Sequence, residues 1–178
     1  MSRALPSQTV GPFFHFGLTT NAALGSMAEP KTPGERIRVR FTLLDGDGAP
    51  VPDGMIELWQ ANAAGQYNDP SFRGFGRLAT DGQGQCTFST IRPGRAPGGK
   101  GGRQAAHISV SVFARGLLGR LCTRVYFEGD PALPDDPVLA LVPVDRRPTL
   151  IARWDGAAGV WDFEIHLQGD RETVFFDV

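Results

Sequence analysis

The chain has 178 residues, of which 41% are hydrophobic, enough for one domain with a buried core. Its 18 basic and 19 acidic residues leave a net charge of -1, which argues against nucleic acid or an anionic membrane as the main partner. No apolar run approaches the ~18 residues that span a bilayer, and residues 1–6 lack the apolar stretch of a secretory signal. We therefore expect a cytoplasmic protein. Cys86 and Cys122 are expected to be buried free thiols, although the sequence leaves a disulfide between them open.

Short apolar segments separated by glycine- and aspartate-rich turns predict an all-β fold. The segment 36–43 alternates with apolar residues at the odd positions, and a second strand is predicted at 55–59. Further strands are predicted at 86–91, 107–114, 121–127, 160–167 and 173–176. This pattern indicates an antiparallel β-sandwich of about eight short strands. One short helix is predicted at 136–142, where Asp136 can cap it, Pro137 suits its first turn and Pro143 ends it.

The first 34 residues differ in character from the rest of the chain. Residues 1–34 are rich in proline and glycine with little periodicity, which predicts an irregular arm before a β-sandwich domain at 35–178. Phe13, Phe14 and Phe16 lie close together in this arm. A disordered tail rarely exposes so much aromatic surface, so the arm is expected to pack on its own domain or on another subunit.

The predicted strand at 107–114 carries half of a possible metal site. Residues 107, 109 and 111 share one face of this strand, so two histidines at 107 and 109 could bind one metal ion. The chain has His107 but Ser109, whose neutral hydroxyl is a poor ligand. Tyr67 follows another strand and could reach the same region. One tyrosine and one histidine do not hold an iron ion.

Several motifs in a fixed order resemble those of the intradiol ring-cleavage dioxygenases. These motifs cover nearly the whole chain: Ser7–Phe13, Trp59–Asn62, Gly65-x-Tyr67, Phe75–Arg77, Ile91–Gly94, Ala106–Ile108, Tyr126–Asp130 and Glu172–Asp177. The resemblance implies a non-haem iron enzyme that cleaves an aromatic diol with O2. Catalytic chains of the family bind Fe(III) through two tyrosines and two histidines, because anionic phenolates stabilise a hard ferric ion.

Carried over to this chain, the family pattern is incomplete. The first ligand tyrosine and the first ligand histidine fall on Tyr67 and His107, whereas the second of each falls on Ala96 and Ser109. An arginine expected three residues before the first histidine falls on Gln104. We call Tyr67, Ala96, Gln104, His107 and Ser109 the vestigial site. With their partners missing, Tyr67 and His107 are expected to be structural residues. If the two lie near each other, a hydrogen bond between them could satisfy both polar groups. No metal or other cofactor is expected on this chain.

These departures resemble those of a non-catalytic alpha chain that pairs with an iron-bearing catalytic beta chain. The resemblance implies a hetero-oligomer that acts on protocatechuate, with the iron on the beta chain. It also implies that the N-terminal arm lines the substrate pocket around the partner's iron through Thr9, Gly11, Pro12 and Phe13. The alternative for these arm residues is ordinary packing. Arg115 could attract the substrate carboxylate, or it could be a solvated loop residue.

Two other functions fit parts of the sequence. A stand-alone β-sandwich binding module is compatible with the composition, because this fold class carries many functions. A homo-oligomeric intradiol dioxygenase acting on a related catechol would require four metal ligands on one chain.

Overall fold

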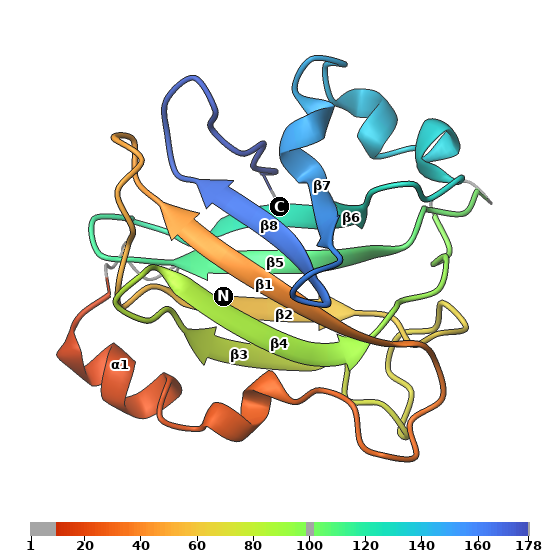
Figure 1. Ribbon diagram of the computed structural model, residues 1–178, viewed down its shortest axis with the longest axis horizontal. Helices are drawn as coiled ribbons and strands as arrows, with labels where there is room; N and C mark the ends of the chain where they lie inside the picture. Colours follow the sequence, from red (N-terminus) through yellow and green to blue (C-terminus); the bar gives the residue numbers. More distant parts are fainter. Residues whose placement is uncertain (1–9, 99–101, 178) are drawn as a thin grey trace, which may run out of the picture.

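One continuous eight-stranded sheet dominates the computed structural model, which describes residues 10–98 and 102–177. Its strands are β1 (Arg36–Leu44), β2 (Met55–Gln60), β3 (Phe75–Ala79), β4 (Gln85–Ile91), β5 (His107–Phe113), β6 (Leu121–Phe127), β7 (Ile151–Asp155) and β8 (Val160–His166). They are hydrogen-bonded in the order β3-β2-β5-β6-β7-β8-β1-β4. In Figure 1, the half with β1, β4 and β8 overlies the half with β2, β3 and β5.

The hydrophobic core lies between these two halves of the sheet. In β1 the odd-numbered residues are buried, as the alternation predicts, and Phe41 contacts Phe88 of β4 and Phe163 of β8 edge-on. The same buried cluster includes Ile56 of β2 and Ile108 of β5 from the opposite half. Because each strand buries one face, the other face of β2, β5 and β6 remains available for polar residues.

The all-β prediction is confirmed, but the prediction of an exclusively antiparallel arrangement is wrong. Strand β1 pairs with β8 in parallel, and β6 pairs with β7 in parallel. The remaining neighbours are antiparallel. Long connections between distant parts of the chain make the parallel pairs possible, and local turn signals do not reveal them. The sandwich arrangement stays a prediction.

Two strands were not predicted, and one predicted strand is absent. Strand β3 contains Gly76, which weakens its sequence pattern, and β7 is only five residues long. Residues 173–176 form no strand, since their only ladder contact is an isolated bridge between Cys122 and Phe176.

The helical segments also differ from the predictions. The segment 136–142 contains only a 3-10 turn, η4 (Leu139–Leu141), because Val142 is extended before Pro143. Two further 3-10 turns, η3 (Leu133–Asp135) and η5 (Arg147–Leu150), flank it. In the N-terminal segment, helix α1 (Pro12–Leu18) and η1 (Ala22–Gly25) were not predicted, since a seven-residue aromatic helix has little sequence signal.

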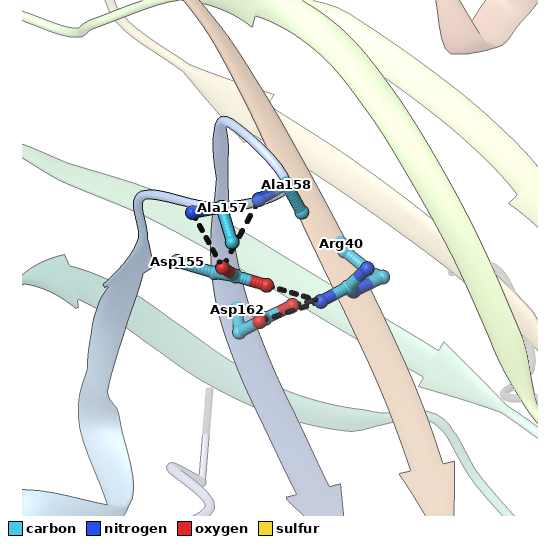
Figure 2. Close-up of polar contacts among 5 residues, drawn as sticks. All are labelled: Arg40, Asp155, Ala157, Ala158 and Asp162. Carbon is cyan, nitrogen blue, oxygen red and sulfur yellow. Dashed lines mark hydrogen bonds and ion pairs between the residues drawn. The ribbon is translucent and has the colours of Figure 1, made fainter.

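An ion cluster ties the β7–β8 hairpin to β1 on the outer surface. Arg40 binds Asp162 through two hydrogen bonds of 2.6 and 2.7 Å and contacts Asp155 at 3.2 Å (Figure 2). The Asp155 carboxylate also accepts from the backbone N–H groups of Ala157 and Ala158, so the hairpin turn and the ion cluster share one carboxylate. The hydrogen bond from the N–H of Ala158 is the main reason that the pKa of Asp155 is lower than usual.

The cysteines are free thiols, Cys86 buried and Cys122 half-buried. Burial raises the pKa of the Cys86 thiol to about 12, so it is an inert part of the core. Within residues 10–98 and 102–177, no helix is long and apolar enough to cross a membrane.

Candidate functional site

The loop after β2 carries Tyr67 to the sheet face that points away from the core. Asn62 organises this loop, because its side-chain oxygen accepts from two backbone N–H groups at 2.9 Å. Gly65 has a φ of +81°, and a Cβ there would lie 2.0 Å from the carbonyl oxygen of Arg95. Only glycine therefore allows the loop to pack directly on the segment that contains Ala96.

Tyr67 and His107 form a direct hydrogen bond of 3.2 Å between the phenol oxygen and Nε2. Nδ1 of His107 lies 2.9 Å from the carbonyl oxygen of Ala105, which can only accept, so Nδ1 carries the proton. Nε2 then accepts from the Tyr67 hydroxyl. Burial, helped by the charge of Arg124, lowers the pKa of His107, and burial raises the pKa of Tyr67. Both side chains are therefore neutral at neutral pH.

The other vestigial-site residues border the same end of β5. Ala96 is buried, and its carbonyl oxygen accepts from the backbone N–H of Gln104 at 2.9 Å. Ser109 lies opposite Trp59 of β2 on one side and Arg124 of β6 on the other. Residues that face each other across neighbouring strands point to the same side of the sheet, which is also the side of His107.

These residues do not fit a ferric ion. Tyr67 and His107 are the only metal donors at the vestigial-site positions, since Ala96 offers a methyl group and Ser109 a neutral hydroxyl. In the part of the chain that the structure describes, no three His, Cys, Asp or Glu residues gather into a metal-binding group. Two ligands are too few for stable iron binding.

Arg124 is a member of this region that the sequence analysis missed. Its guanidinium donates to the side-chain oxygen of Gln104 and lies 6.0 Å from the ring centroid of Phe176. Its charge also acts on the phenol of Tyr126. The sequence offered no signal for this residue, because its place depends on the register between β5 and β6. The arrangement puts a positive charge beside Tyr67 and His107.

The buried carboxylate of Asp136 fixes the start of β5. One oxygen accepts from the Ala105 N–H at 2.7 Å, and the other accepts from the Tyr126 hydroxyl at 3.0 Å. The second oxygen also accepts from the N–H groups of Val138 and Leu139. Asp136 thus caps the turn that follows it, as predicted. The same carboxylate also binds Tyr126 of β6 and Ala105, whose carbonyl oxygen orients His107.

The family model described as "Dioxygenase" matches residues 9–169. The chain belongs to the intradiol dioxygenase family. It is 39% identical to the protocatechuate 3,4-dioxygenase alpha chain of Burkholderia cepacia, over 97% of this chain and 96% of that protein. It is also 39% identical to the beta chain of the same organism's enzyme, over 94% of this chain and 77% of that protein. The family resemblance seen in the sequence is therefore confirmed.

A solved structure supports the same fold assignment. The dioxygenase domain of a dioxygenase and carbohydrate-binding protein fusion from Streptomyces sp. SirexAA-E superposes with a TM-score of 0.67 at 28% identity. The match covers 92% of this chain and 97% of that one. This intradiol dioxygenase chain therefore keeps the family scaffold over most of its length.

The arm residues and Arg115 of this dioxygenase chain lie away from the vestigial site. His107 is the first residue of β5, and Phe113, its last, contacts Phe14 of α1 with ring centroids 5.7 Å apart. A seven-residue strand spans ~20 Å. Gly11, Pro12 and Phe13 lie at the start of α1, and Arg115 follows β5 at the same end. Thr9 is outside the described residues.

We expect Asp136→Asn to lower the free energy of unfolding by about 2–4 kcal/mol, because an amide cannot accept from all four donors. The measurement is urea unfolding followed by circular dichroism. Asp135→Asn is the matched control, since Asp135 is exposed. An equal effect of both substitutions would contradict the assigned role of Asp136.

The lowered pKa of His107 predicts a pH-dependent stability. Histidine in an unfolded chain has a pKa of ~6.5, which is higher than that of His107 in the folded state. As the pH falls, the unfolded state therefore binds this proton first, and the folded state loses stability below that pH. His107→Gln should flatten the stability profile between pH 7.5 and 5, whereas Tyr67→Phe should keep the slope. Unfolding midpoints at several pH values measure this. An unchanged slope in His107→Gln would refute it.

Proposed function

We propose that this chain is the non-catalytic alpha subunit of an Fe(III)-dependent intradiol dioxygenase that converts protocatechuate and O2 to 3-carboxy-cis,cis-muconate. The observation that carries this proposal is the ligand set at the vestigial site. Ala96 and Ser109 offer no ligand, while Tyr67 and His107 satisfy each other by a 3.2 Å hydrogen bond. The rest of the family scaffold is intact.

The similarity to both chains of one enzyme supports a two-chain assembly. This chain covers 96% of the Burkholderia cepacia alpha chain but 77% of the beta chain. The expected partner is a beta chain with two tyrosines and two histidines, and its ferric ion would supply the site that binds the diol. We place this assembly in the cytoplasm.

The position of the arm supports a contribution to a pocket on the partner. Thr9, Gly11, Pro12, Phe13 and Arg115 are the proposed substrate-binding residues. Gly11 and Arg115 lie at the end of β5 opposite to His107, so they cannot serve a site around His107 of the same chain. Among the described residues, a Cβ at Gly11 would meet nothing within 4 Å, so its backbone is open to close approach.

Arg115 is suited to attract a carboxylate. Its side chain is 70% exposed, and its ion pair with Asp53 is long, at 3.9 Å. A surface pair of this kind contributes little, so a substrate carboxylate can replace Asp53.

The two alternative functions are less well supported. A homo-oligomeric intradiol dioxygenase needs four ligands on one chain, and the vestigial site provides two. A stand-alone binding module would not require the similarity to an enzyme chain over nearly its full length.

Iron and activity measurements test the proposal. The chain purified alone should be colourless, contain no stoichiometric iron and leave protocatechuate unchanged. Co-expressed with a beta-type chain, it should yield a coloured complex that consumes O2 with protocatechuate. Stoichiometric iron with tyrosinate-to-iron absorbance in the lone chain would overturn the proposal.

Substitution of Arg115 tests the pocket assignment in the assembled enzyme. Arg115→Gln should raise KM for protocatechuate severalfold with a smaller change in kcat, and it should barely change KM for catechol, which has no carboxylate. Arg120→Gln is the matched control, because Arg120 is exposed in the same β5–β6 connection. Equal changes for both substrates would contradict carboxylate binding by Arg115.

A further inference from the structure

The charge next to the vestigial site has the wrong sign for a metal site. Arg124 lies opposite Ser109 in the β5–β6 register, and Tyr126, two residues on, lies opposite His107. Both pairs lie on the face of the sheet that points away from the main core. The guanidinium therefore projects from the strand next to the position where the second family histidine is missing.

A hydrogen bond and an aromatic ring hold this guanidinium. It donates to the amide oxygen of Gln104. Its charge also acts on the phenol of Tyr126, which itself donates to Asp136 at 3.0 Å. The ring of Phe176 lies against it, with 6.0 Å between the ring centroid and the guanidinium carbon. Arginine stays protonated at all ordinary pH values, so this is a fixed unit charge with little freedom to leave.

The charge reaches both remaining donors of the vestigial site. It opposes protonation of the His107 imidazole and favours ionisation of the Tyr67 phenol, so it acts on the groups that would bind a metal ion. Even at the dielectric constant of water, a unit charge about 6 Å from a dication weakens its binding by about tenfold. The effect is larger where protein replaces water.

We propose that Arg124 is a built-in cation that takes the electrostatic place of the metal and closes this site to metal ions by charge, in addition to the loss of two ligands. The guanidinium is held beside the vestigial site by its hydrogen bond to Gln104 and by the ring of Phe176. The inference concerns this chain alone and does not depend on which partner it has.

Cobalt(II) binding to the full chain tests the proposal. Ser109→His adds a second imidazole on the face of His107 and makes three donors with Tyr67, which is enough for a protein metal site. We expect S109H to bind Co²⁺ weakly and S109H/R124Q to bind it at least tenfold more tightly, measured by d–d absorbance and titration calorimetry. S109H/R120Q, which removes an arginine from the β5–β6 connection, should match S109H.

Two further variants separate charge from shape and guard against loss of fold. S109H/R124K keeps the charge without the guanidinium fork and should bind Co²⁺ as weakly as S109H. S109H/R124M fills a similar volume without polar groups and replaces R124Q if that variant unfolds. Equal Co²⁺ affinity of S109H and the charge-free variants would overturn the proposal, as would tight binding by S109H/R124K.

Discussion

The carboxylate of Asp136 is buried completely, and its hydrogen bonds fix three different pieces of the chain. It accepts from the Ala105 N–H just before β5, from the Tyr126 hydroxyl on β6, and from two N–H groups at the start of η4. A buried carboxylate with this many donors is costly to disturb, because any lost donor leaves a desolvated charge poorly compensated. Since Ala105 in turn accepts from Nδ1 of His107, the tautomer of His107 and its bond to Tyr67 follow from the position of Asp136.

Next to Asp136, the chain keeps the fold of the family, but the vestigial site carries a positive side chain. The phenol of Tyr67 and the imidazole of His107 are both neutral and hydrogen-bonded to each other, and Ala96 contributes a buried methyl group. The guanidinium of Arg124 supplies a positive charge held by Gln104. All of these groups have partners within the chain, so the region is stable without an ion. The opposite end of β5, with Gly11 and Arg115, is left open for the proposed contact with a partner's substrate pocket.

The sequence predicted what depends on local pattern. The alternation in β1, the strands that begin at Met55, Gln85, His107, Leu121 and Val160, and the all-β class follow from residue periodicity. The sequence allowed a hydrogen bond between Tyr67 and His107 if they lay near each other, and the structure contains this bond. The parallel pairs and the place of Arg124 depend on register between distant segments, which no local pattern encodes. The helix predicted at 136–142 is only a 3-10 turn, because Val142 is extended before Pro143.

In the proposed assembly, this chain provides a subunit surface and part of a pocket, while the metal belongs to another chain. Anomalous diffraction at the iron absorption edge from crystals of the assembled enzyme tests it directly, because each iron atom is located as well as counted. We expect one iron peak per pair of chains, on the partner and within reach of Gly11 and Arg115 of this chain. We expect no peak beside Tyr67 and His107. An iron peak between Tyr67 and His107 would contradict it.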